Sequence, residues 1–172
     1  MNPPYTIKAS KSGVGENETT IDLNSSTSLT LMLITDTTPP IITFLPPTPA
    51  SGALTKENVT IKVRISDDYS DISTVLIELN GVNQTMTIEG TGKTVNATYN
   101  ITSEGRYNYR IHANDSANNW NSTETRTVTI DRTPPAITII SPQNNATYAT
   151  STIQVNVSAS DPAGIGVVIA QL

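Results

Sequence analysis

The chain has 172 residues, which is enough for one or two domains of ordinary size. Its net charge is −5 and its 10 Lys and Arg residues are scattered, which argues against nucleic acid as a partner because phosphate binding needs clustered basic side chains. The absence of cysteine excludes disulfides, thiolate metal sites and cysteine nucleophiles. No apolar run reaches the ~18 residues that a membrane-spanning helix needs.

The composition favours β-structure. Thr, Ser and Asn fill 60 of the 172 positions, whereas the chain has one Phe and three Met to build a helical core. The β-branched residues Thr, Val and Ile dominate, and they suit the pleated, half-buried surface of a sheet. We therefore expect an all-β fold.

The first 35 residues contain three short stretches that predict strands, at 5–10, 20–23 and 29–34. We interpret residues 1–35 as the closing strands of a preceding β-sandwich module. The segment is similar to the end of a carboxypeptidase-regulatory-like sandwich, which shares a Tyr-x-x-x-Ala strand, here Tyr5 to Ala9, and a Leu-rich closing strand.

Residues 36–131 show the period-two alternation of half-buried strands. In 59–66, for example, every second residue is Val or Ile and the residues between are polar. The same pattern predicts seven strands, at 41–44, 59–66, 75–79, 86–88, 95–101, 107–113 and 128–130. Seven strands in about 100 residues predict one complete immunoglobulin-like antiparallel sandwich, with Tyr107 or Tyr109 as its tyrosine corner.

A repeat follows this module. Asp-x-Thr-Pro-Pro begins at Asp36 and again at Asp131, 95 residues later, and the strand from Val59 recurs at Ile153, 94 residues later. Residues 132–172 are therefore predicted to be the opening strands of the next Ig-like domain, at 137–140, 153–159 and 167–170. Because proline fixes φ and donates no hydrogen bond, the double proline indicates a stiff joint between modules. The alternative is an ordinary turn inside one larger domain.

Two motifs carry a resemblance to a known family. They are the Asp-x-Thr-Pro-Pro entry and the pattern Gly-x-Tyr followed by Ala-x-Asp-x-x-x-Asn, which runs from Gly105 to Asn119. Together they resemble the Ig-like repeats of bacterial and archaeal cell-surface proteins. The resemblance implies tandem Ig-like sandwiches, one complete and two partial, and an extracellular or cell-surface location.

The function predicted from this organisation is structural: a spacer in a secreted or cell-surface protein, such as a surface-layer (S-layer) or filament glycoprotein, with neighbouring modules or copies of itself as partners. One alternative is an adhesin or carbohydrate-binding module, in which Trp120 would stack on a sugar ring of a cell-surface glycan. Another is a filament subunit whose partial modules complete one another between chains. An enzyme is not expected, because the single histidine, His112, lies on a predicted strand and no glycines of a nucleophile elbow surround any serine.

Asn-x-Ser/Thr sequons are more frequent than chance, since ten of the 16 asparagines qualify. They predict N-linked glycosylation, with the alternative that a Thr-rich and Asn-rich surface produces sequons incidentally. The candidate sites are Asn17, Asn24, Asn58, Asn83, Asn96, Asn100, Asn114, Asn121, Asn145 and Asn156.

Acidic residues gather near the predicted module ends, and four of them are candidate calcium ligands: Asp36, Asp67, Asp115 and Asp131. Calcium takes six to eight oxygen ligands, often loop carboxylates and carbonyls. The alternative is that these residues form Asx-turns, in which an Asp side chain accepts hydrogen bonds from its own loop. No other cofactor is predicted.

Overall fold

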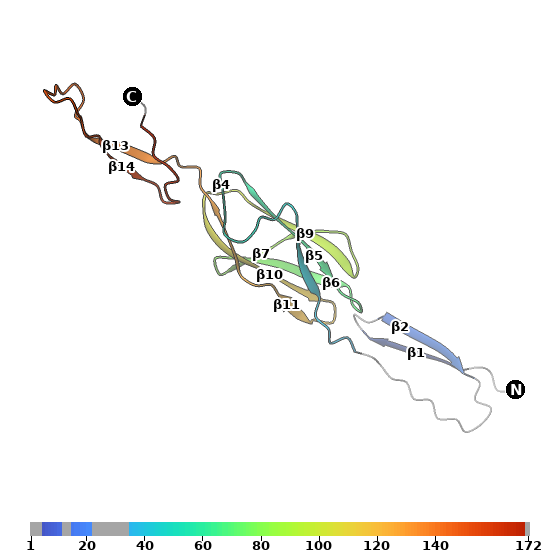
Figure 1. The fold of residues 1–172 in the computed structure, drawn as a ribbon. Helices are drawn as coiled ribbons and strands as arrows, with labels where there is room; N and C mark the ends of the chain where they lie inside the picture. The colour runs from blue at the N-terminus through green and yellow to red at the C-terminus, as the bar shows by residue number, and fades with distance from the viewer. Residues whose placement is uncertain (1–4, 12–14, 22–34, 171–172) are drawn as a thin grey trace. The chain divides into compact units, whose positions relative to one another are not determined.

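The computed structural model describes residues 5–11, 15–21 and 35–170, with side chains from residue 35 onward. All regular structure in these residues is β-strand (Figure 1). They contain no helix that is long and apolar enough to cross a bilayer. The chain divides into two compact units, Met1–Ile130 and Asp131–Leu172.

The N-terminal hairpin pairs β1 (Tyr5–Lys11) with β2 (Gly15–Ile21) antiparallel, with Tyr5 opposite Ile21. The strand expected at 5–10 is therefore present. The strand expected at 20–23 instead begins at Gly15 and ends at Ile21. Its first half is polar and has no alternation to reveal it, and pairing with β1 extends it. The strand predicted at 29–34 lies outside the described residues.

The first unit contains a two-layer immunoglobulin-like β-sandwich (Figure 1). One sheet has the order β3-β5-β9-β8, and the other has β4-β12-β10-β6-β7 with β11 also paired to β10. All strand pairs in the two sheets are antiparallel except β4 with β12. The strands are β3 (Ile41–Leu45), β4 (Ala53–Thr55), β5 (Val59–Ser66), β6 (Ile72–Leu79), β7 (Val82–Thr85), β8 (Thr87–Glu89), β9 (Thr94–Ile101), β10 (Gly105–Asp115), β11 (Trp120–Ser122) and β12 (Arg126–Ile130).

The core lies between the sheets, where the predicted alternation places it. The apolar residues of β5 face those of β6, β10 and β12, and most of them are fully buried: Ile61, Val63, Ile65, Val75, Ile77, Ile111, Val128 and Ile130. The Phe44 and Tyr109 rings meet edge to face, with centroids 6.2 Å apart. Burying a Val or Ile side chain contributes about 1.5–3 kcal/mol. This apolar layer therefore supplies most of the stability of the sandwich.

The tyrosine corner is formed by Tyr107. Its hydroxyl donates a hydrogen bond to the backbone carbonyl of Ser103 at 3.0 Å, which is the local geometry of that motif. Tyr109 lies instead inside the sandwich, where burial raises the pKa of its hydroxyl. The sequence predicted either tyrosine for this role, and the structure shows that Tyr107, the one nearer the turn before β10, fills it.

Three strands of the sandwich were not predicted: β4, β7 and β11. Each has three or four residues, which is too short to show alternation. A turn signal for β7 was nevertheless present, because Asn80-Gly81 is a preferred hairpin turn and both residues have positive φ, 49° and 85°. The structure therefore has more than the seven predicted strands.

The second unit contains an antiparallel pair, β13 (Ala136–Ser141) with β14 (Asn156–Ser160). Ile137 lies opposite Ala159 and Ile139 opposite Val157, just as Ile42 lies opposite Ile65 and Phe44 opposite Val63 in the first unit. The pairing thus repeats that of β3 and β5 at spacings of 95 and 94 residues.

The strand predicted at 167–170 does not form, and that prediction was wrong. The first-unit segment 95 residues earlier begins β6, whose partners are β7 and β10. The described part of the second unit contains no counterpart of either strand, so the backbone groups of 167–170 have no ladder to join.

A matched pair of substitutions tests the assignment of the two faces. Ile65 is fully buried, whereas Ile41, on the neighbouring strand, is 64% exposed. We expect Ile65→Ala to lower the free energy of unfolding by about 2–5 kcal/mol, through lost burial and a cavity. Ile41→Ala should change it by no more than about 0.5 kcal/mol. Urea denaturation followed by circular dichroism gives both values, and equal losses would show that the faces are misassigned.

Candidate metal centre

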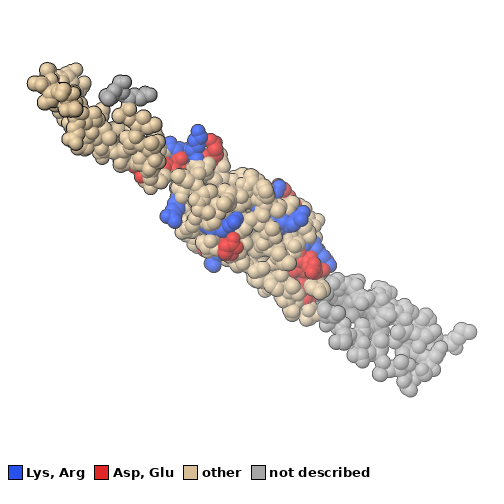
Figure 2. All heavy atoms as spheres, in the orientation of Figure 1, with Lys and Arg blue, Asp and Glu red and all other residues tan. Residues whose placement is uncertain are grey.

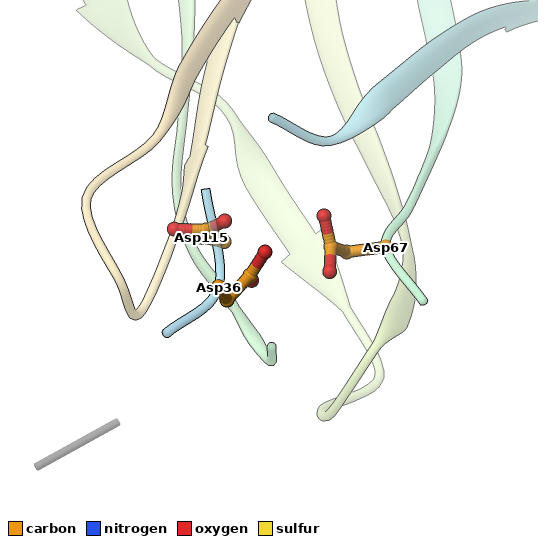
Figure 3. A group of neighbouring side chains, drawn as sticks. All are labelled: Asp36, Asp67 and Asp115. Atoms are coloured by element: carbon orange, nitrogen blue, oxygen red, sulfur yellow. The ribbon is translucent and has the colours of Figure 1, made fainter. Parts of the chain in front are cut away.

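Three of the four predicted calcium ligands meet at one end of the sandwich (Figure 3). Asp36 lies on the entry segment, residues 36–40, just before β3, Asp67 follows β5, and Asp115 ends β10. One oxygen from each carboxylate lies within 4.8 Å of the other two. Segments that are far apart in the sequence therefore contribute to one acidic cluster, defined as Asp36, Asp67 and Asp115.

Strand alternation explains why one of these carboxylates points inward, since Asp67 follows Ile65 by two residues and continues the buried face of β5. Asp115 ends β10, where Ala113, Asn114 and Asp115 are all buried. A β-bulge between Asn114 and Asp115 shifts the pairing of β10 with β6 at this point. Asp67 is 8% exposed and Asp115 is 1% exposed.

Each carboxylate is also held by its own loop. Oδ1 of Asp67 accepts hydrogen bonds from the backbone N–H groups of Tyr69 and Ser70, both at 2.8 Å. Oδ1 of Asp115 accepts from the Asn119 N–H at 2.9 Å, and Oδ2 accepts from the Asn119 side chain at 2.8 Å. The Asx-turns considered as the alternative to metal binding are thus present at these positions.

The turns leave several buried oxygens without a hydrogen bond. Oδ2 of Asp36, Oδ2 of Asp67 and Oγ of Ser70 are all shielded from solvent and have no hydrogen-bond partner. Ser70 is itself buried. A buried charged or polar oxygen without a partner is costly, and such groups in proteins are usually satisfied by a donor, a water molecule or a cation.

Two polar groups beside Asp36 favour the ionised form of its carboxyl group. The nearby Ser70 hydroxyl, and after it the Thr38 N–H at 2.9 Å, lower the pKa of the Asp36 carboxyl below its ordinary value of 3.8. The Ser70 dipole acts here through proximity, since its geometry falls short of a hydrogen bond. At neutral pH Asp36 is therefore ionised.

Two amides connect the entry segment to the turn after β10 and to β11. The Asn119 side chain donates to the Asp36 carbonyl at 3.3 Å, and the Asn121 side chain donates to the Pro40 carbonyl at 2.7 Å. Pro40 is fully buried. Through Asp36, the acidic cluster thus includes the segment by which the chain enters the sandwich.

Asp131, the fourth predicted ligand, is not a member of the acidic cluster. It belongs to the second unit, where its Oδ1 accepts a hydrogen bond from the Thr133 N–H at 2.9 Å. Asp36 makes the same turn with Thr38 in the first unit. The prediction grouped the two residues because both lie at predicted module ends, whereas each Asp begins its own module.

The structure separates the candidate glycosylation sites by exposure. The side chains of Asn58, Asn83, Asn100, Asn145 and Asn156 are exposed, and those of Asn96 and Asn121 are half-buried. Asn114 was expected on a solvent-facing position, and that expectation was wrong. It is 7% exposed, and its amide donates to the Asn118 side chain in the turn that follows β10. The side chains of Asn17 and Asn24 lie outside the described residues.

A second polar cluster lies on the outer face of β6, β10 and β11. Arg110 donates two hydrogen bonds to Oε2 of Glu78, at 3.0 and 2.8 Å, and His112 Nε2 lies 3.2 Å from the same oxygen. His112 Nδ1 is 2.6 Å from the Ser122 hydroxyl. The sequence did not predict this cluster. Ser122, His112 and Glu78 follow one another as the members of a Ser-His-acid triad do. Arg110 binds the same Glu78 oxygen as His112, which is the arrangement of a surface ion-pair network.

Trp120, the candidate sugar-binding residue, is about half exposed on β11. Its indole N–H donates to the Asn118 side chain at 3.1 Å.

No protein-family model matches this chain, and no curated protein matches it. Solved structures that are similar to this chain include the following three. An endo-β-1,4-mannanase from Thermotoga petrophila is 12% identical with a TM-score of 0.41, over 56% of this chain and 20% of that one. An engineered protein is 21% identical with a TM-score of 0.37, over 54% and 20%. Fibronectin(III)-like modules of CbhA from Clostridium thermocellum are 15% identical with a TM-score of 0.36, over 71% and 63%.

This chain thus spans about a fifth of the length of the first two proteins. TM-scores below 0.5 carry no information about the function of this chain. Its sandwich class follows from its own strand pairing.

The outer polar cluster generates a pH prediction. The Arg110 guanidinium, and after it the His112 ring, hold the pKa of Glu78 below its ordinary value of 4.5. A carboxyl group whose pKa is lower in the folded chain than in the unfolded chain stabilises the fold at pH values above the unfolded-state pKa. This contribution is lost as the pH falls through the folded-state pKa. We expect Glu78→Gln to lower the urea midpoint at pH 7, with a deficit that narrows below about pH 4.5. Glu89→Gln, at an exposed edge position, is the control. A deficit that is the same at pH 7 and pH 3 would contradict the assignment.

Proposed function

We propose that this chain is a spacer region of a secreted or cell-surface protein, built from tandem Ig-like modules and without enzymatic activity of its own. In such a region each module supplies a rigid sandwich, and the joints determine how stiff the whole array is. The Asp-x-Thr-Pro-Pro segments are the proposed joints, and the partners are neighbouring modules of the same kind.

One observation carries this proposal: the second unit begins at Asp131 as the sandwich of the first unit begins at Asp36. Its Asp131–Thr133 turn repeats the Asp36–Thr38 turn, and its β13–β14 pair repeats the register of β3 and β5. A repeated junction followed by a repeated strand pair is expected of modules in series. The charges support the same proposal, because Figure 2 shows both signs spread over the visible face of the sandwich, without the basic patch that a nucleic-acid partner requires.

Glycopeptide mapping of the protein from its natural source tests the surface location. We expect sugar on exposed sequons such as Asn58, Asn83 and Asn100, because their side chains are accessible. Asn114 should be unmodified, since its amide is buried and hydrogen-bonded. Antibodies against the sandwich should label intact cells or the secreted fraction. Labelling that requires permeabilised cells, together with the absence of sugar, would contradict the proposal.

A second candidate function, a self-completing filament subunit, is favoured by the second unit. Ile137, Ile139, Val157 and Ala159 share one face of the β13–β14 pair, and Ile137 and Ile139 are each 63% exposed. In the first unit the equivalent face is covered by β6, β10 and β12. Residues 133–172 include a single charged side chain, Asp161, so little electrostatic repulsion opposes contact with another chain.

Light scattering over a concentration series separates the two candidates. A self-completing subunit should form dimers or longer polymers, and Ile139→Asp should abolish them by placing a charge on the apolar face. Thr138→Asp, on the opposite face, is the matched control and should leave association unchanged. If the chain remains monomeric at high concentration, the filament function is excluded and the spacer function is retained.

A further inference from the structure

We propose that Asp36, Asp67 and Asp115 form a calcium site whose occupancy fixes the entry segment to the end of the sandwich. The site is a property of the sandwich itself, and it stands or falls independently of the spacer function. Figure 3 shows the three carboxylates directed toward one another from separate segments.

Buried oxygens, rather than acidity alone, carry this inference. Asp67 is more than nine-tenths buried, its Oδ1 is already used by two N–H groups, and its Oδ2 has no hydrogen-bond partner. On the entry segment, Asp36 Oδ2 is also shielded from solvent and has no hydrogen-bond partner. Two such oxygens beside a third carboxylate repel one another unless a positive charge lies between them.

The donor set fits a hard divalent cation. It consists of carboxylate oxygens, with the buried Ser70 hydroxyl nearby and without nitrogen or sulfur donors. Calcium binds oxygens at about 2.3–2.6 Å, so ligands on opposite sides of the ion are about 4.6–5.2 Å apart. Because one oxygen of each carboxylate lies within 4.8 Å of the other two, one such ion can contact all three carboxylates. Magnesium requires stricter octahedral geometry and retains more water, so we expect it to bind more weakly.

The ion would change how the entry segment is attached. This segment is bound by two amide hydrogen bonds, one from Asn119 in the turn after β10 and one from Asn121 on β11. A cation shared by the three carboxylates adds a link from Asp36 to the loop after β5 and to the end of β10. It also replaces mutual repulsion by attraction. Calcium should therefore stiffen the point at which the chain enters the module.

The experiment uses the full chain and its only tryptophan, Trp120, as the fluorescence reporter of unfolding. In the wild-type chain, calcium at a hundredfold excess over its Kd should raise the melting temperature by about 10 °C relative to EDTA. Isothermal titration with calcium, and separately with magnesium, gives the affinity and the ion preference. Calcium that binds without raising the melting temperature, or at many sites with equal weakness, would overturn the proposal.

Asp67→Asn is the decisive variant. Asparagine keeps the Oδ1 acceptor for the Tyr69 and Ser70 amides, so the loop should still fold. In EDTA the variant should melt at or above the wild-type temperature, because one repelling charge is removed. In calcium it should melt below wild type, because a ligand is lost.

Asp68→Asn removes the same charge from the adjacent exposed position and should retain the full response to calcium. A calcium response that survives Asp67→Asn, or that is lost equally in Asp68→Asn, would overturn the site. If Asp67→Asn melts below wild type in both conditions by the same amount, the carboxylate has only a structural role and the proposal fails.

Discussion

The face-to-face packing of β5 against β6, β10 and β12 is the interaction on which the rest of this molecule depends. It buries every second residue of β5, and Asp67 inherits an inward direction from Ile65, two positions before it. Asp115 is buried at the end of β10, where the pairing with β6 shifts. The two carboxylates thus lie just beyond the apolar layer, where the sandwich ends. The fold therefore places charge at a position where solvation is poor.

This placement has a local cost and a structural use. The loops offset part of the cost, because the N–H groups of Tyr69, Ser70 and Asn119 all donate to the buried carboxylates. The entry segment adds a third carboxylate, Asp36, instead of a basic residue. The proposed calcium ion would bind these three carboxylates together at the entry point, which links the chemistry of the acidic cluster to the proposed role of the joint.

Much of the fold follows from the sequence, because alternation reports burial directly. The phases of β5, β9 and β10 were predictable, and so was the register of β13 and β14, which follows from the repeat. The short strands β4 and β11 were not predictable, because a strand of three residues depends on the partner that it pairs with. The failure at 167–170 has the same origin, since a strand needs neighbours that the described second unit does not provide.

The candidate site was predictable in part. Asp36, Asp67 and Asp115 stood out because acidic residues gathered at predicted module ends, but only the three-dimensional structure shows that they converge. Asp131 was included because it also lies at a predicted module end, but it belongs to the second unit and is not a member of the acidic cluster. Asn114 was misplaced because its side chain bonds to Asn118 in the following turn, a contact that a period-two pattern does not reveal.

Hydrogen-exchange mass spectrometry of the full chain, in calcium and in EDTA, tests the central claim most directly. The account predicts that calcium slows exchange in peptides covering 36–40, 67–71 and 115–119, whose N–H groups surround the acidic cluster. Peptides from the middle of β5 and β10 should be protected equally in both conditions, because the apolar core holds them. Identical exchange around the acidic cluster with and without calcium would contradict the account.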